Sequence, residues 1–134
     1  MPPSTDAPLP VAIVADDEWC VREFLVLCLQ MQGFAALGAS TGEAAVEMLL
    51  ANEGRAALAL IDLHMPGAGG LATVAALRRI KPWLRCCLMT GDLGGDEEAL
   101  AAGADCVLHK PMTPAALAAC VRHLQSEALQ PWPA

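Results

Sequence analysis

The sequence predicts an α/β domain built on a doubly wound parallel sheet of five strands. With 134 residues, of which 55% are hydrophobic and 17% charged, the chain fits one globular domain with a sizeable core. Short, almost continuously apolar runs recur along it, as in strands that are covered on both faces of a parallel sheet. Segments with a helical spacing of apolar residues separate these runs, and this alternation favours parallel strands joined by right-handed crossovers.

The first part of the chain contains two strand-helix units, with strands expected at residues 11–15 and 35–39. One face of the first helix carries apolar side chains at three-four spacing, namely Val21, Phe24, Leu25, Cys28 and Leu29. The second helix is expected to begin with a capping box of Ser40 and Glu43. Its apolar side chains are Val46, Leu49 and Leu50.

Two further units follow, with strands expected at residues 57–61 and 84–89. The helix between them runs from about residue 70 to residue 80 and ends at Lys81-Pro82, because a residue before proline avoids the helical conformation. The fourth helix opens after Gly94-Gly95. Its first turn carries the acids that complement a helix dipole, namely Asp96, Glu97 and Glu98.

The last unit has a short strand at residues 106–108 and a fifth helix that starts at Thr113. Pro114 fits the first helical position because its fixed φ suits the helix and its missing N–H would be unpaired there anyway. The side chains expected to face the core are Leu117, Cys120, Val121 and Leu124.

Composition sets the limits of the domain and the classes of partner. Four prolines in the first ten residues predict a flexible tail over 1–9, followed by a domain over 10–127 and a C-terminal tail over 128–134. The net charge of −7 argues against direct binding to nucleic acid or to an anionic membrane, since both are polyanions. The six cysteines show no metal-ligand spacing, so we interpret them as reduced, buried thiols of a cytoplasmic protein.

Polar residues stand at the ends of four expected strands, namely Asp16, Asp17, Asp62, Thr90 and Lys110. In sheets of this type the working site lies at the carboxyl ends of the strands, so we expect these side chains to meet. Each acid alone could simply cap a helix, but three together would repel one another without a cation. Carboxylate oxygens suit Mg²⁺, while the lysine and the hydroxyl could hold the oxygens of a phosphoryl group.

The motifs at these strand ends together resemble the receiver domain of two-component response regulators, over about residues 10–125. They are "IVADDE", "ALIDLHMPGAGG", "CLMTGD" and "VLHKP". The resemblance implies a flavodoxin-like (βα)5 fold with strand order 2-1-3-4-5. It also implies that Asp62 accepts a phosphoryl group from a phosphohistidine on a histidine kinase or a histidine phosphotransfer protein. The protein would then promote its own phosphorylation and dephosphorylation without being a turnover enzyme.

The same resemblance implies roles for the neighbouring residues. Asp17, Asp62 and the backbone carbonyl of His64 would coordinate Mg²⁺ directly, and Asp16 would act mainly through a water. Thr90 and Lys110 would hold the phosphoryl oxygens and take part in the conformational switch. The Lys110-Pro111 bond would be cis and aim the lysine into the pocket. Gly70 stands where the family usually has a glycine.

One position departs from the family pattern, and two others are expected to set how long the phosphorylated state lasts. Val107 occupies the place of the aromatic residue that normally rotates during signalling, and a β-branched side chain cannot make that movement. His64 and Asp92 stand where side chains border the attacking water, so we expect them to tune the lifetime of the aspartyl phosphate. The fourth and fifth helices would form the face for a homodimer or a target protein.

Three alternatives compete with a phosphorylated receiver. A dinucleotide or flavin binder would need a glycine-rich phosphate cradle after the first strand, where this chain has Asp16, Asp17 and Glu18. A phosphatase of the haloacid-dehalogenase type would carry its acids as D-x-D on the first strand, whereas these are adjacent. A receiver fold that binds partners without phosphorylation is the remaining alternative. The sequence leaves open a stand-alone regulator, a phosphorelay intermediate and a domain of a longer protein.

Overall fold

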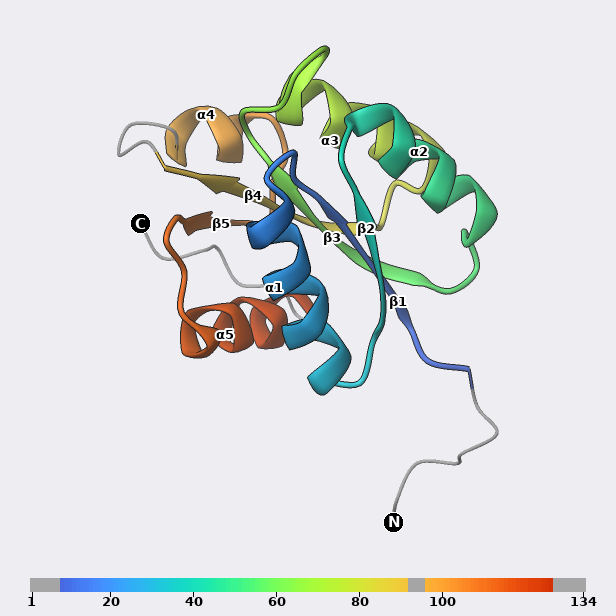
Figure 1. Cartoon of the computed structure of the whole chain (residues 1–134). Helices are drawn as coiled ribbons and strands as arrows, with labels where there is room; N and C mark the ends of the chain where they lie inside the picture. The colour runs from blue at the N-terminus through green and yellow to red at the C-terminus, as the bar shows by residue number, and fades with distance from the viewer. Residues whose placement is uncertain (1–7, 92–95, 127–134) are drawn as a thin grey trace.

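The computed structural model describes residues 8–91 and 96–126, and it contains a single five-stranded sheet in the order β2-β1-β3-β4-β5. Figure 1 shows strands and helices alternating along the chain. The elements are β1 Val11–Ala15, α1 Trp19–Met31, β2 Ala35–Ala39, α2 Gly42–Ala51, β3 Ala56–Asp62, α3 Gly69–Ile80, β4 Arg85–Thr90, α4 Asp96–Ala101, β5 Cys106–His109 and α5 Pro114–Leu124. The expected fold class and strand order are confirmed.

All neighbouring strands are parallel, so their carboxyl ends share one edge of the sheet. Ala15 at the end of β1 pairs with Ile61, and Thr90 at the end of β4 pairs with His109. Every residue of β1 is buried, as expected for a strand covered on both faces. The register therefore brings the residues that follow each strand to the same place.

The helices form two layers, one on each face of the sheet (Figure 1). Helices α1 and α5 pack on one face through a core that includes Leu25, Leu29 and Leu117. Helices α2, α3 and α4 pack on the other face, where Leu49 and Leu77 are fully buried. Side chains alternate between these cores along each strand, because successive residues point to opposite faces.

The expected start of the second helix is wrong by one residue. The N-cap of α2 is Thr41, whose Oγ1 accepts a hydrogen bond from the backbone N–H of Ala44 at 3.1 Å, so Ser40 does not form the cap. The buried face of α2 is also shifted, since Leu50 is 58% exposed and Ala45 is buried instead. A ten-residue helix rich in alanine has several faces of similar hydrophobicity, and the packing against the sheet selects one.

The fifth helix agrees closely with expectation. Thr113 is its N-cap, with Oγ1 accepting from the Ala116 N–H at 3.1 Å, and Pro114 is the first helical residue. Its buried residues are Leu117, Cys120, Val121 and Leu124.

Some expectations concern segments that the structure does not describe. Three of these segments lie outside the described residues, namely the tail over 128–134, most of the tail over 1–9, and Gly94-Gly95.

Cys20 is exposed and Cys28 is half-buried, so the expectation of buried thiols is wrong for Cys20. Within residues 8–91 and 96–126, no helix has the length and apolar character that crossing a membrane requires.

Candidate functional site

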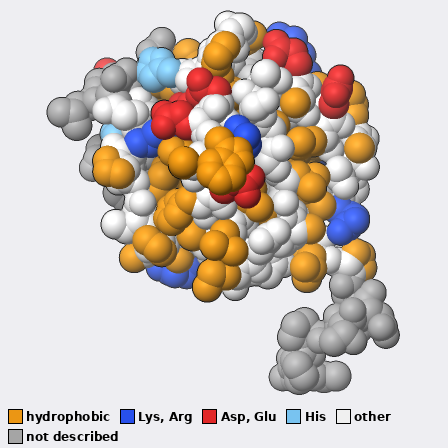
Figure 2. All heavy atoms as spheres, viewed as in Figure 1, with side chains coloured by type: hydrophobic (Ala, Val, Ile, Leu, Met, Phe, Trp, Pro, Cys, Tyr) orange, Lys and Arg blue, Asp and Glu red, His pale blue; other side chains and the backbone are white. Residues whose placement is uncertain are grey.

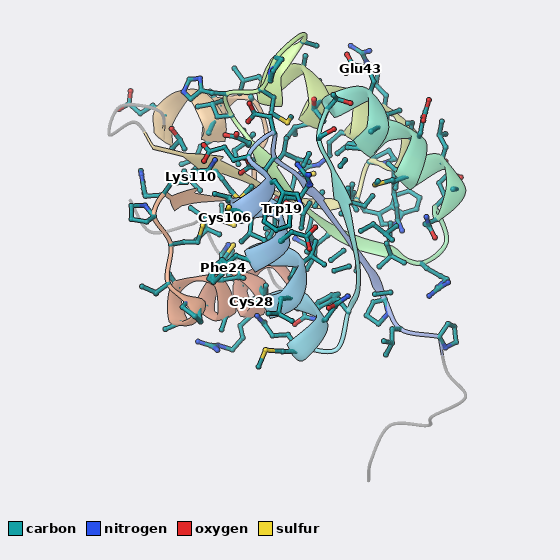
Figure 3. All side chains as sticks on the ribbon, viewed as in Figure 1. Trp19, Phe24, Cys28, Glu43, Cys106 and Lys110 are labelled. Atoms are coloured by element: carbon teal, nitrogen blue, oxygen red, sulfur yellow. The ribbon has the colours of Figure 1, made fainter. Side chains whose placement is uncertain are left out.

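The carboxyl edge of the sheet gathers the polar residues that the sequence singled out. Asp16 directly follows β1, Asp62 is the last residue of β3, and Thr90 is the last residue of β4; all three are buried. Asp17 is exposed beside them, at the mouth of the site. Lys110 follows β5, and Figure 3 shows it on the loop beside the start of α1.

Backbone hydrogen bonds continue the sheet into the site and fix these positions. The Asp16 N–H donates to the Ala39 carbonyl at 3.0 Å, and the Lys110 N–H donates to the Thr90 carbonyl at 2.8 Å. The N–H of Leu63, one residue beyond Asp62, donates to a β4 carbonyl at 2.8 Å. The residues around the site are therefore held by the same ladder that holds the strands.

Lys110 bridges the two buried carboxylates. Its Nζ lies 2.8 Å from Asp16 Oδ2 and 3.3 Å from Asp62 Oδ2, and the lysine side chain is only 17% exposed. Asp16 Oδ1 accepts a hydrogen bond from the Glu18 N–H at 2.9 Å, and Asp62 Oδ1 accepts one from the His64 N–H at 3.2 Å. Each acid thus has one oxygen held by the backbone and one facing the ammonium group.

Burial and the contact between Lys110 and the carboxylates act in opposite directions on the pKa values of Asp62 and Lys110. Burial raises the pKa of Asp62, and the negative charge of Asp16 raises it further, while Lys110 and the His64 N–H oppose both effects. Burial tends to lower the pKa of Lys110, but the hydrogen bond and charge of Asp16, followed by those of Asp62, outweigh it and raise the pKa. Lys110 therefore stays a cation at neutral pH.

The three carboxylates fit a hard divalent cation. Asp16, Asp17 and Asp62 each offer an oxygen, and these oxygens lie within 4.8 Å of one another. One lysine does not balance three acids, which leaves the cluster negative. An oxygen-only donor set with one side open to solvent is the kind of site that Mg²⁺ occupies with its remaining waters.

The loop after β3 runs close against the backbone of the site, and it needs glycine there because a side chain would not fit. A Cβ on Gly70 would lie 2.3 Å from the Asp62 carbonyl oxygen and 2.7 Å from the Leu63 Cα, so the start of α3 touches the backbone of the candidate phosphoacceptor. Gly67 and Gly69 have φ values of +84° and +80°, which side chains rarely adopt. On the other side, the Lys110-Pro111 bond is cis.

Residues at the border of the site stand apart from the buried cluster. The backbone N–H of His64 donates a hydrogen bond to Asp62, but the His64 side chain is exposed. Asp92 lies outside the described residues. Val107 is 2% exposed and belongs to the core shared with α3 and α4, so it points away from α1 and α5.

Sequence reasoning missed an apolar groove next to the site. It has a volume of about 490 Å³ and runs between the start of α1 and the loop before α5, lined by Val21, Phe24, Met112 and Lys110 among others. Val21 and Phe24 have the spacing of core residues, but they are only half-buried because α5 leaves the start of α1 uncovered. Trp19, one turn earlier, is 65% exposed.

Known proteins with similar sequences and structures agree with this geometry. The response regulator receiver domain matches residues 12–122. The chain is 31% identical over 114 residues to the phosphate regulon transcriptional regulatory protein PhoB of Klebsiella pneumoniae, covering 82% of this chain and 49% of that protein. It thus spans about half the length of the curated relatives it matches.

Solved structures show the same fold. Chemotaxis protein CheY4 of Vibrio cholerae aligns with a TM-score of 0.79 at 22% identity, covering 87% of this chain and 98% of that one. A CheX–CheY complex of Borrelia burgdorferi that holds BeF3 and Mg²⁺ aligns with a TM-score of 0.80 at 19% identity, covering 88% and 90%. Together with the match over residues 12–122, the sheet order and the acidic edge, this identifies the chain as a member of the response regulator receiver domain family of two-component signalling.

Proposed function

We propose that this chain accepts a phosphoryl group from a phosphohistidine onto Asp62, in a Mg²⁺-dependent reaction, and signals through the resulting conformational change. The observation that carries the proposal is the setting of Asp62, a buried carboxylate with the Lys110 Nζ at 3.3 Å and two further acids within 4.8 Å. The chain would promote this transfer, and it would also promote the later hydrolysis of its aspartyl phosphate, in which water takes the phosphoryl group and inorganic phosphate is released.

The transfer needs an attacking oxygen and a place for the charge that moves with the phosphoryl group. An oxygen of Asp62 would form the new bond to phosphorus, while the bond from phosphorus to the imidazole nitrogen breaks and its electron pair leaves with the histidine. Lys110, which remains protonated, would pair with a phosphoryl oxygen after the negative charge has moved outward from the Asp62 carboxylate. Thr90 is buried at the end of β4, and its hydroxyl would donate a hydrogen bond to another phosphoryl oxygen.

Asp16, Asp17 and Asp62, with the His64 backbone carbonyl, would hold the cation. Bound Mg²⁺ would supply charge neutralisation at the phosphoryl oxygens and a fixed geometry for the attack. The contacts of Asp16 support a role through a bound water. One of its oxygens accepts a hydrogen bond from the Glu18 N–H, and the other forms an ion pair with Lys110. Asp17 is exposed and is available for direct coordination.

The donor would be a histidine kinase or a histidine phosphotransfer protein of the cytoplasm. Figure 2 shows hydrophobic side chains gathered over α1 and α5, below a group of acidic ones. The groove between the start of α1 and Met112 supplies an apolar contact beside Asp62, so a donor seated there would bring its histidine close to the acid. The fourth and fifth helices remain the proposed face for a homodimer or a target protein.

Intact mass after incubation with Mg²⁺ and a small-molecule phosphoryl donor tests the proposal. We expect the wild-type protein to gain one phosphoryl group, and Asp62→Asn, or wild type without Mg²⁺, to gain none. Asp105→Asn is the matched control, because Asp105 lies at the opposite edge of the sheet and binds Arg78 and the Cys86 N–H. A gain of equal size in Asp62→Asn would contradict the assignment of the phosphoacceptor.

The lifetime of the aspartyl phosphate would depend on His64 and Asp92. His64 is exposed while its backbone N–H contacts Asp62 at 3.2 Å, so its side chain stands near the path of an attacking water. We expect His64→Asn and Asp92→Ala each to change the rate of phosphate loss severalfold, measured by mass after removal of the donor. Unchanged rates in both folded variants would end this part of the proposal.

A receiver that binds partners without phosphorylation is the second candidate, and Val107 favours it. Its side chain is buried in the core and β-branched, so it cannot make the large rotation expected of an aromatic residue at this position. A folded wild-type protein that binds Mg²⁺ but gains no phosphoryl group, even from a phosphohistidine protein, would support this candidate.

A further inference from the structure

Three cysteines from separate elements meet inside the core, on the side of the sheet away from α3. Cys87 of β4, Cys106 of β5 and Cys120 of α5 are each 0% exposed, and their sulfur atoms lie within 4.8 Å of one another. The Sγ atoms of Cys106 and Cys120 are 2.8 Å apart, and both residues are free thiols. Figure 3 shows Cys106 in the layer between β5 and the helices α1 and α5.

The fold brings these residues together although their spacing in sequence does not suggest it. Cys87 and Cys106 pair directly across β4 and β5, so their side chains point to the same face. Cys120 lies on the buried face of α5, which covers that part of the sheet. Cys86, the neighbour of Cys87, points into the opposite core.

The surroundings favour a product that carries no charge. The sulfurs lie in an apolar cluster with residues such as Leu117 and Val121, where an uncompensated charge is costly. A cation held by thiolates would usually leave the cluster charged, and Zn²⁺ in a closed site takes four ligands where this group offers three sulfurs. A disulfide between two thiols is neutral and needs no further ligand.

We propose that Cys106 and Cys120 are the site of a reversible disulfide, formed when a hydroperoxide oxidises the pair. In the first step one thiolate displaces hydroxide from the peroxide and becomes a sulfenic acid. The other thiol then attacks that sulfur, the S–S bond forms, and the sulfenic oxygen leaves as water. For hydrogen peroxide the sum is two thiols and one peroxide giving one disulfide and two waters.

Either thiol of the pair can react first, because the Sγ atoms of Cys106 and Cys120 face each other at 2.8 Å and either one can donate the hydrogen bond. To join, the two sulfurs move closer by less than about 1 Å, since a disulfide bond is about 2.05 Å long.

The bridge would tie β5 to α5 around the loop that carries Lys110. The two cysteines are 14 positions apart, and the segment between them contains the cis Lys110-Pro111 bond. Closing a loop of this size restricts the unfolded chain, so oxidation should raise the melting temperature. The inference does not depend on the phosphorylation of Asp62.

The test starts from the full chain with Cys20→Ser and Cys28→Ser, because these two cysteines are the more accessible ones. The protein is treated with hydrogen peroxide in the presence of a chelator and then denatured, alkylated and digested. We expect the mass of the intact protein to fall by that of two hydrogen atoms, and a peptide linking Cys106 to Cys120 to appear. Dithiothreitol should reverse both changes and the rise in melting temperature.

Three substitutions separate the pair from its neighbour Cys86. Cys86→Ser changes an equally buried cysteine on β4, the strand next to β5, and should leave the bridge intact. Cys106→Ser and Cys120→Ser should each abolish it and leave a sulfenic acid on the remaining cysteine of the pair, which a dimedone probe captures. Three results would each overturn the assignment. The first is a disulfide that includes Cys87, and the second is no loss of mass at peroxide levels that oxidise an exposed methionine. The third is a bound metal that protects the thiols until the chelator removes it.

Discussion

The contact of Gly70 with Asp62 shows how one missing side chain shapes the site. The start of α3 lies directly against the backbone of the proposed phosphoacceptor, and the Gly70 N–H donates to the Leu63 carbonyl at 3.0 Å. There is no room for a Cβ, since it would meet backbone atoms that cannot rotate away. Gly70 thereby lets the loop after β3 turn without displacing Asp62.

Gly70→Ala should therefore destabilise the fold by about 2–3 kcal/mol, the usual cost of forcing an atom into a packed region. Urea unfolding measures the change. Gly54→Ala is the control, because nothing lies within 4 Å of its added Cβ, and its stability should change by less than about 0.5 kcal/mol. If Gly70→Ala were as stable as the control, the backbone here would be more adaptable than the contact implies.

Among the helices, α2 shows how a cap and a packing face are chosen. Ser40 and Thr41 both have a hydroxyl, and either could precede the helix. Only the Thr41 side chain accepts from a backbone N–H of the first turn, with its backbone in the extended conformation that an N-cap needs. The close contact of Gly42 with Thr73 of α3 fixes where the first turn of α2 can lie.

Thr41→Ala should lower the free energy of unfolding by about 1 kcal/mol, because it leaves the Ala44 N–H without its hydroxyl acceptor. Ser40→Ala changes the exposed neighbour and should have an effect below about 0.5 kcal/mol. Thermal or urea unfolding of the two variants, side by side, checks the assignment. Equal losses would show that both hydroxyls contribute to the start of α2.

Across the whole domain, the acids at the sheet edge are an unfavourable charge cluster that the fold maintains. Asp16 and Asp62 are buried beside a single lysine, and Asp17 adds a further charge at the mouth. A cation that binds only this folded arrangement stabilises the folded state by mass action.

Mg²⁺ at saturating concentration should raise the melting temperature by several degrees, since a hundredfold excess over Kd contributes about 2.7 kcal/mol. Asp17→Asn should lose most of this shift. Its stability without Mg²⁺ should stay close to that of wild type, because the side chain is exposed. Scanning calorimetry with sodium chloride at matched ionic strength provides the reference, and a full shift in Asp17→Asn would remove Asp17 from the metal site.

Much of this protein follows from local patterns in the sequence. The apolar runs and helical spacings predict the alternating strands and helices, since each element must bury one or both faces. The signals around Thr113 and Pro114 predict the start of α5, because they act within one turn. The position of Asp16, Asp62 and Lys110 at one edge follows from the parallel sheet, in which the ends of all strands coincide.

Other features were decided only when distant elements packed together. The packing of α2 against the sheet and α3 chose Thr41 and Ala45 over Ser40 and Leu50, which local pattern could not distinguish. The meeting of Cys87, Cys106 and Cys120 depends on strand register and on the placement of α5. Sequence determined the kinds of element and the edge where chemistry gathers, because those depend on local periodicity and chain direction; the contacts themselves depend on three-dimensional packing, which no single segment encodes.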